Sequence, residues 1–203
     1  METEKIIEEI KRTITVEAQG IDNLVNTLDM GVMEQIVRLI GDCKGRVVLT
    51  GCGTSAMAAR KIAHSLNCIE RPALFLTPSD AVHGALGVLQ QGDILVLISK
   101  GGNTVELTQL LPACRTKGAV SIGVTENPDS TLGKECDICL KVKVETEPCR
   151  FNMLATASTL AVISAANVVL STCAKTIKCW VHITQAVLHS IWRCRRRFWR
   201  ACR

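Results

Sequence analysis

The stretch Arg46-Val-Val-Leu-Thr50, followed at once by Gly51-Cys-Gly-Thr-Ser55, decides the fold of this chain. A short apolar run of this kind is typical of a buried strand, and the two glycines permit a tight turn. Helix-forming residues then continue from Ser55 to Leu66. The stretch therefore predicts a strand, a glycine turn and a helix in succession.

The same alternation continues along the chain. Further strand signals lie at residues 73–77, 93–99, 119–124 and 138–144, and a helix is expected from about Thr104 to Lys117. Before the first strand, residues 2–40 carry apolar positions at helical spacing, which predicts two or three amphipathic helices. Five buried strands alternating with helices predict a doubly wound α/β fold with a five-stranded parallel sheet. Ligands of such sheets bind beyond the carboxyl ends of the strands.

Two compositional regimes meet near Cys173. The 203 residues are 47% apolar and 21% charged, which excludes a disordered chain. Residues 1–173 carry 16 Lys and Arg against 19 Asp and Glu, whereas residues 174–203 carry eight bases, no acid and all three tryptophans. We therefore predict one domain over residues 1–173, including the N-terminal helices, and an atypical basic tail over 174–203.

The tail admits two interpretations. One is an arm for an anionic membrane surface or nucleic acid, because basic residues with interleaved aromatics can use both charge and stacking. The interpretation that we favour is a change of reading frame shortly after Cys173, and on that basis we expect neither a nucleic-acid nor a membrane partner.

Several features predict a cytoplasmic location. No apolar run approaches the roughly 18 residues of a membrane span, and the first twelve residues are charged and acidic rather than signal-like. The eleven cysteines include no zinc-finger-type cluster with histidine, so we interpret them as mostly buried thiols and expect no metal.

Two glycine turns, Gly51–Ser55 and Ser99–Thr104, each lead into a predicted helix. Free backbone N–H groups and the positive end of the helix dipole favour an anion at such a place. Hydroxyls of Ser55, Ser99 and Thr104 add donors, and Lys100 adds a positive charge. Two such turns on neighbouring strands predict one shared phosphate site.

Each turn also has a purely structural interpretation. Glycines permit tight turns, and Asn103 followed by Glu106 fits a helix N-cap with a glutamate three residues on. A dinucleotide site is disfavoured although Gly51-x-Gly53-x-x-Ala56 matches the looser Rossmann fingerprint, because the acid Glu70 precedes the second strand instead of ending it. A Walker loop is excluded because no Gly-Lys-Ser/Thr stands at the required spacing.

Two further side chains are candidates for proton transfer. His83 lies in a polar loop after the second strand, and histidine titrates near neutrality. Glu147 follows the fifth strand and precedes Pro148, which holds it extended. A surface histidine and a solvated pair of glutamates are the structural alternatives for these positions.

These residues resemble the sugar isomerase, or SIS, domain. The segments Gly51-Cys-Gly-Thr-Ser55, Ser99-Lys-Gly-Gly-Asn-Thr104 and Asn127-Pro-Asp-Ser130 stand where that family keeps its phosphosugar-binding turns. Thr77-Pro-Ser-Asp-Ala-Val-His-Gly-Ala-Leu-Gly87 and the segment through Glu147-Pro-Cys149 resemble the arabinose-5-phosphate isomerase branch in particular. The resemblance runs from about residue 5 to residue 170.

The resemblance implies a flavodoxin-like sheet, a homo-oligomer (a dimer or tetramer) with sites near subunit contacts, and phosphorylated sugars as ligands. It also implies exchange of an aldose phosphate with a ketose phosphate without a redox cofactor. By this resemblance, His83 and Glu147 fall on positions of the isomerase site and are the catalytic candidates. The substrate-binding candidates are Gly51, Gly53, Thr54, Ser55, Ser99, Lys100, Asn103 and Thr104.

The chain departs from that branch at defined places. Thr54 stands where the branch usually has a lysine, and Asn103 where it usually has a glutamate. The His-Pro-Gly-Gly segment that commonly follows the last helix is absent, as are the paired regulatory modules. The expected function is an isomerase that interconverts arabinose 5-phosphate and ribulose 5-phosphate through an enediol. The alternative is a non-catalytic phosphosugar-sensing domain.

Overall fold

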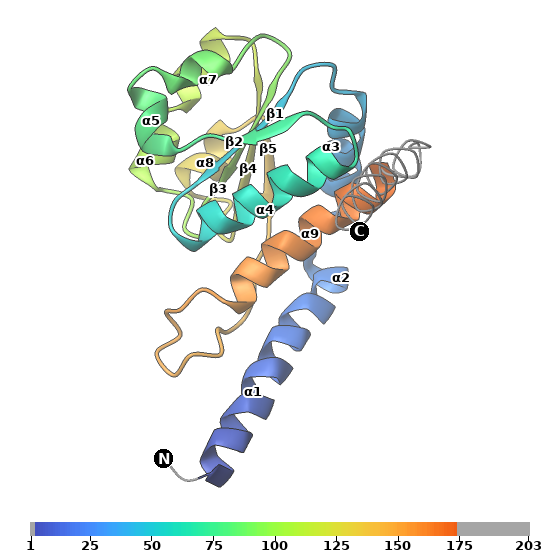
Figure 1. The fold of residues 1–203 in the computed structure, drawn as a ribbon, viewed down its shortest axis with the longest axis vertical. Helices are drawn as coiled ribbons and strands as arrows, with labels where there is room; N and C mark the ends of the chain where they lie inside the picture. The colour runs from blue at the N-terminus through green and yellow to red at the C-terminus, as the bar shows by residue number, and fades with distance from the viewer. Residues whose placement is uncertain (1–2, 174–203) are drawn as a thin grey trace, which may run out of the picture.

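The computed structural model describes residues 3–173, and its centre is a five-stranded, all-parallel sheet (Figure 1). The strand order β2-β1-β3-β4-β5 is that of a flavodoxin-like doubly wound sheet, which confirms the predicted fold class. The strands are β1 (Val47–Gly51), β2 (Ala73–Phe75), β3 (Ile94–Ile98), β4 (Val120–Thr125) and β5 (Ile138–Lys141). The predicted tail interpretations concern residues 174–203 and lie outside the described residues.

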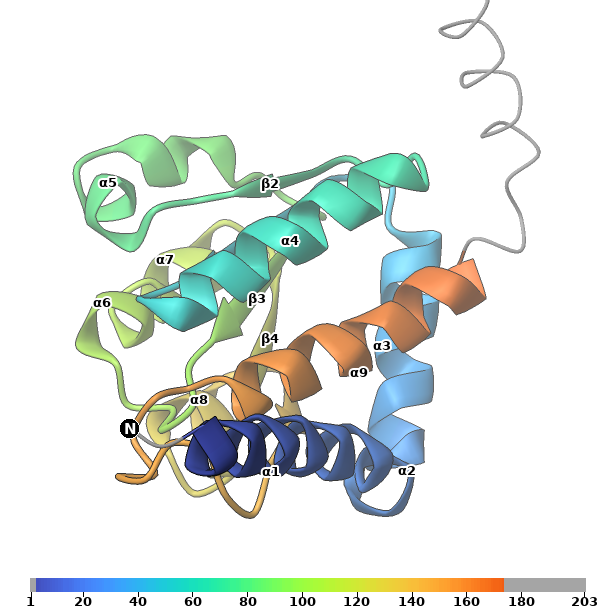
Figure 2. The same cartoon turned by 60° about the horizontal axis from the view of Figure 1, so that its bottom comes forward.

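Helices cover both faces of the sheet (Figures 1 and 2). One face packs against α3 (Met30–Asp42), α4 (Thr54–Cys68) and α9 (Ala157–Cys173). The other face packs against the shorter helices α5 (Pro78–Val82), α6 (Val105–Thr108), α7 (Leu111–Thr116) and α8 (Thr131–Glu135), with the 3-10 turn η1 (Ala85–Val88). Central strands β1 and β3 are buried along their whole length, as their unbroken apolar runs predict.

The helix expected from about Thr104 to Lys117 is in fact two short helices, α6 and α7. Pro112 lies in the first turn of α7. Proline has no N–H to donate and its ring crowds the preceding turn, so it is tolerated at a helix start but not inside one. The prediction of one continuous helix was therefore wrong at this point.

The N-terminal helix α1 (Thr3–Asp22) lies beside α9 and extends beyond the sheet (Figures 1 and 2). The short α2 (Leu24–Thr27) links it to α3. None of the residues of α1 is buried, although Ile6, Ile7, Ile10 and Ile14 repeat at helical spacing. Within the described residues of the single chain, this isoleucine stripe stays exposed.

The prediction of mostly buried thiols was wrong for the described part of the chain. Of the eight cysteines in residues 3–173 only Cys114 and Cys173 are buried, and six are half-buried. The cause is their placement near element ends, as with Cys43 after α3 and Cys52 in the turn after β1.

Among the described helices, none combines the length and the apolar content that crossing a membrane requires.

Candidate functional site

The turns after β1 and β3 lie side by side at the carboxyl ends of the sheet. The two strands pair along their full length, with Gly51 opposite Ile98. A Cβ at Gly51 would come within 3.0 Å of the backbone of Ser55, so glycine lets α4 begin directly over the end of its strand. The two predicted phosphate turns are thus neighbours, as the sequence indicates.

The turn from Ser99 to Thr104 is closed by its own hydroxyls. The Oγ of Ser99 and the Oγ1 of Thr104 are 2.7 Å apart and share a hydrogen bond, and the N–H of Gly102 donates to Ser99 Oγ at 3.1 Å. Gly102 has a φ of +71°, a conformation that favours glycine. The arrangement holds two hydroxyls and a run of backbone N–H groups beside the start of α4.

A cavity of about 50 Å³ opens next to these turns. The predicted residues Thr54, Ser55 and Lys100 line it together with Glu126 and Ser158. Its remaining walls are apolar or small: Ala58, Ile98, Val124, Thr125, Val142, Ala155, Thr159 and Val162. The cavity therefore joins the ends of β1, β3 and β4 to the start of α9.

Lys100 is the cation of this cavity. Its Nζ donates to Glu147 Oε1 at 2.8 Å and lies 3.6 Å from Glu126 Oε1, an ion-pair contact too long for a hydrogen bond. Burial acts to lower the pKa of Lys100, but the two carboxylates outweigh it and the pKa is raised. The side chain remains 42% exposed, so a charged ammonium is accessible to a ligand.

Glu147 is the most enclosed charge of the site, with a side chain that is 1% exposed. Besides the Lys100 contact, its carboxylate accepts from the Thr156 N–H at 3.0 Å, from the Ser158 N–H at 3.4 Å and from the Ser158 hydroxyl. Burial acts to raise the pKa of Glu147, but the hydrogen bonds from Lys100, Ser158 and Thr156 prevail and lower it. Glu147 is therefore an ionised carboxylate with its acceptor positions filled.

Glu126 was not among the residues predicted from the sequence. It follows β4 directly, and its N–H donates to the carbonyl of Lys100 at 2.9 Å, which fixes the two turns to each other. Burial raises the pKa of Glu126, although Lys100 partly opposes the effect. The signal that could have found it is its position, an acid at the carboxyl end of the fourth strand.

The side chain of Asn103 is hydrogen-bonded to the first residue of α8. Its Oδ1 accepts from the N–H of Thr131 at 2.8 Å and from the Thr131 hydroxyl at 3.0 Å. The N-cap of α6 is Thr104, so the helix-capping alternative for Asn103 was wrong. The amide ties the β3 turn to the first residue of the helix after β4.

His83 lies apart from the other candidates. It follows α5, after the edge strand β2, whereas Glu147 contacts Lys100 at the end of the central strand β3. The His83 side chain is exposed and makes no hydrogen bond or ion pair within residues 3–173. Within the described residues, His83 is not among the side chains that line the cavity or contact Glu147.

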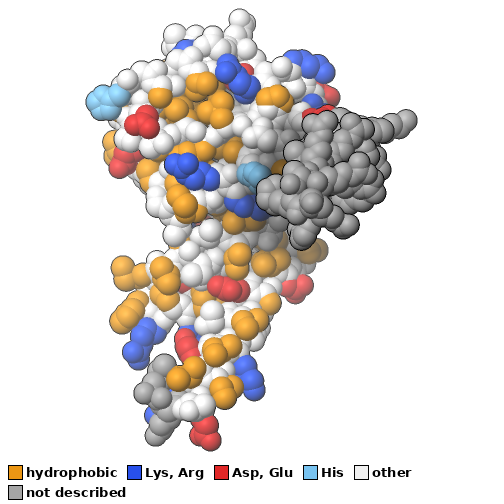
Figure 3. Space-filling view, viewed as in Figure 1, with side chains coloured by type: hydrophobic (Ala, Val, Ile, Leu, Met, Phe, Trp, Pro, Cys, Tyr) orange, Lys and Arg blue, Asp and Glu red, His pale blue; other side chains and the backbone are white. Residues whose placement is uncertain are grey.

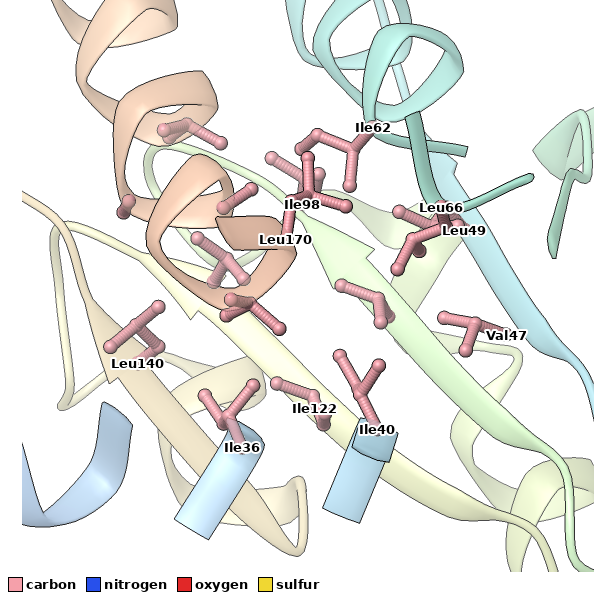
Figure 4. A pocket seen from close by; sticks show the side chains of 16 residues that line it. Ile36, Ile40, Val47, Leu49, Ile62, Leu66, Ile98, Ile122, Leu140 and Leu170 are labelled. Atoms are coloured by element: carbon pink, nitrogen blue, oxygen red, sulfur yellow. The ribbon is translucent and has the colours of Figure 1, made fainter. Parts of the chain in front are cut away.

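A second cavity of about 50 Å³ lies in the core between the sheet and the helices α3, α4 and α9 (Figure 4). Only aliphatic side chains line it, among them Ile40, Leu49, Ile62, Ile98 and Leu170. It offers no polar group to orient a ligand, so we regard it as a packing void of the core.

A flavodoxin-like sheet with hydroxyl-bearing glycine turns at the carboxyl ends of its strands is typical of the doubly wound α/β domains, whose ligands bind at that end of the sheet. Within that class, the family model of the SIS domain matches residues 39–170. The chain belongs to the SIS domain family, as the sequence motifs indicated.

Three similar proteins place the chain within this family. It is 36% identical over 154 residues to the arabinose 5-phosphate isomerase KpsF of Escherichia coli O6:H1, covering 76% of this chain and 47% of KpsF. A candidate sugar-phosphate isomerase of Listeria monocytogenes is 55% identical with a TM-score of 0.84, covering 85% of this chain and 91% of that one. An Escherichia coli CFT073 protein solved in complex with arabinose 5-phosphate is 26% identical with a TM-score of 0.82, covering 86% and 93%. The chain spans about half the length of the curated relatives that it matches.

Proposed function

We propose that this protein is an aldose–ketose isomerase that interconverts arabinose 5-phosphate and ribulose 5-phosphate. The observation that carries the proposal is Lys100, held at 2.8 Å by Glu147 and at 3.6 Å by Glu126, in a cavity beside two hydroxyl-bearing turns. The likeness to isomerases of arabinose 5-phosphate supports the same substrate. The cysteines of the described part are thiols rather than disulfides, which supports the cytoplasmic location that the sequence predicts.

The reaction moves a proton between C1 and C2 through an enediol, so it needs a base, an acid for the oxygens and a grip on the phosphate. In the proposal, Ser55, Ser99 and Thr104 hold the phosphate with backbone N–H groups at the start of α4, and Lys100 adds the positive charge. His83 and Glu147 are the further site residues that the family resemblance implies. The reaction needs no oxidant or reductant, because the aldose and the ketose are isomers.

The direct test is to incubate the purified full chain with arabinose 5-phosphate and to follow the formation of ribulose 5-phosphate. Turnover that is lost in Ser55→Ala, with unfolding temperature unchanged, supports the proposal. Arabinose without the phosphate is the matched control substrate and should react poorly.

A second candidate function is a sensor that binds a phosphorylated sugar without converting it. The observation that favours it is Asn103, which replaces the glutamate usual in the branch and has its oxygen occupied by Thr131. Saturable binding of arabinose 5-phosphate with no ribulose 5-phosphate formed would support the sensor over the isomerase.

Replacing Lys100 by alanine should weaken the binding of arabinose 5-phosphate. Hydrogen bonds to charged groups contribute about 1.5–3 kcal/mol, which corresponds to a loss of roughly 10- to 100-fold in affinity. Titration calorimetry of the variant with arabinose 5-phosphate and with arabinose measures this. If the affinity for the phosphorylated sugar is unchanged, Lys100 does not supply the charge that replaces the lysine lost at Thr54.

We further propose that two copies of the chain form the active assembly. His83 follows the edge strand β2 and does not line the cavity of its own chain, so a second copy can bring the His83 of one chain to the cavity of another. The isoleucine stripe of α1 offers a surface for the association, and Figure 3 shows apolar side chains along this part of the molecule. Apolar Phe151, Met153 and Leu154 are also exposed.

Replacing Ile10 by aspartate should dissociate the oligomer. Ile10 is 53% exposed in the single chain, so a charge there costs the monomer little but opposes an apolar helix contact. Light scattering coupled to size exclusion measures the mass, and Glu8→Gln, on the opposite face of the same helix, serves as the control. A variant that keeps the mass of the parent protein excludes the stripe as the contact.

A further inference from the structure

Glu126 and Glu147 flank the same ammonium but differ in what else they contact. Glu126 Oε1 is buried and has no hydrogen-bond partner within the described residues, and the side chain is 21% exposed and lines the cavity. An unpaired acceptor atom at the wall of a polar cavity is costly unless a ligand or water completes it. The carboxylate of Glu126 lies 3.6 Å from the Lys100 ammonium but accepts no hydrogen bond at Oε1, so it keeps acceptor capacity for a ligand.

The carboxylate of Glu147, by contrast, already accepts several hydrogen bonds. Four donors, from Lys100, Thr156 and the N–H and hydroxyl of Ser158, converge on its carboxylate. Protonation of Glu147 would break a part-buried ion pair and leave the Lys100 ammonium without its nearest partner. Such a carboxylate fixes the place of the lysine and joins the segment after β5 to the start of α9.

We propose that Glu126 is the base that moves the proton between C1 and C2, and that Glu147 is a positioning residue that holds Lys100 for the ligand. This inference rests on the isomerase function proposed above and divides the roles among its acidic residues.

The step conserves atoms and electrons. Glu126 accepts the proton as the C2–H bond of the aldose breaks, the electron pair forms C1=C2, and O1 gains a proton from His83 in the role proposed for it. The enediol then loses its O2 proton to His83, C2=O2 forms, and Glu126 returns its proton to C1. Both side chains end in their starting states, so no co-reactant is needed.

The pH dependence separates the two glutamates. The charged groups that act on Glu126 are Lys100 from the β3 turn, with Glu147 and Lys143 from the segment after β5. Because its pKa is raised, the fall of kcat/KM on the acid side should lie above the usual carboxylate range. Neutralising Glu147 removes a charge that raises the pKa of Glu126 and lets Lys100 turn toward it, so the fall should move to lower pH.

The experiment measures kcat, KM and the pH profile of arabinose 5-phosphate isomerisation by the full chain and by variants. Glu126→Gln should lower kcat by about 10²- to 10⁴-fold, keep KM within a few fold and lose the acid-side fall. Glu147→Gln should raise KM, keep the acid-side fall and displace it to lower pH. Glu135→Gln, a surface glutamate paired with Arg115, is the control that leaves the kinetics unchanged.

The outcomes are distinct. If the parent protein is active and Glu126→Gln keeps more than a tenth of its kcat, Glu126 is not the base, while the isomerase function stands. If Glu147→Gln abolishes the acid-side fall, Glu147 is the base and the roles are reversed. A parent protein without turnover overturns the isomerase function and this inference with it. Should Glu126→Gln fail to fold, Glu126→Asp replaces it, with a reduced kcat and a retained acid-side fall expected.

Discussion

Replacing His83 by alanine is expected to lower the turnover of arabinose 5-phosphate by about 10²- to 10⁴-fold, the usual cost of losing a positioned acid or base. Affinity for the substrate should change far less, because the phosphate turns lie at the ends of other strands, β1 and β3. His83 is exposed and follows α5 at the sheet edge, so the substitution should not destabilise the fold. Steady-state kinetics together with calorimetric binding measures both quantities.

A mixing experiment extends this test to the assembly. Chains with His83→Ala and chains with Glu126→Gln should each have little activity alone. After unfolding and refolding together they should regain activity, because some sites then combine an intact His83 from one chain with an intact Glu126 from another. Mixed oligomers without recovered activity would show that His83 does not act across the contact. Equal loss of binding and turnover in His83→Ala would give it only a pocket-shaping role.

Replacing Gly102 by alanine should both destabilise the domain and abolish the tight phosphate turn. A left-handed φ of +71° costs a non-glycine residue about 1–3 kcal/mol. The added Cβ would also contact the side chain of Ser130, which caps α8, and would lie 2.8 Å from Thr125 Oγ1. Thermal unfolding should show a lower midpoint, and binding of arabinose 5-phosphate should be lost.

Gly101 provides the matched control for this prediction. It precedes Gly102 in the same turn, but a Cβ there would meet no atom within 4 Å and its φ is not in the left-handed region. Gly101→Ala should therefore unfold at nearly the temperature of the parent protein. A similar midpoint for both variants would contradict the argument from backbone conformation and close packing.

The strands and the two glycine turns that follow β1 and β3 could be predicted from the sequence because their signals are local. Apolar runs such as Asp93–Ser99, each ended by glycines, give strand and turn without knowledge of any distant residue. The register of β1 against β3, which brings the two turns together, then follows from the parallel sheet. The break between α6 and α7 also had a local signal in Pro112, which the helical periodicity outweighed.

The pairing within the site could not be predicted in the same way. Lys100 and Glu147 are 47 positions apart, and only the fold brings them to 2.8 Å. In the sequence, Glu126 stands next to an ordinary turn and nothing singles it out. Its burial, and the oxygen that accepts no hydrogen bond, become visible only in the folded domain, where it lines a cavity with residues of α9. His83 does follow the second strand, as predicted, but the strand order that puts β2 at the sheet edge, outside the cavity, is a global property.

The site draws its residues from almost the whole length of the domain, which has a consequence for synthesis. Translation makes Ser55 early, then Lys100 and Glu126, and makes Glu147 and Ser158 only near the end. Because α9 covers the same sheet face as α3 and α4, a nascent chain that stops before it lacks both the Ser158 donors to Glu147 and part of the core. A sugar phosphate that binds only the folded state can therefore stabilise the finished domain but none of its shorter precursors on the ribosome.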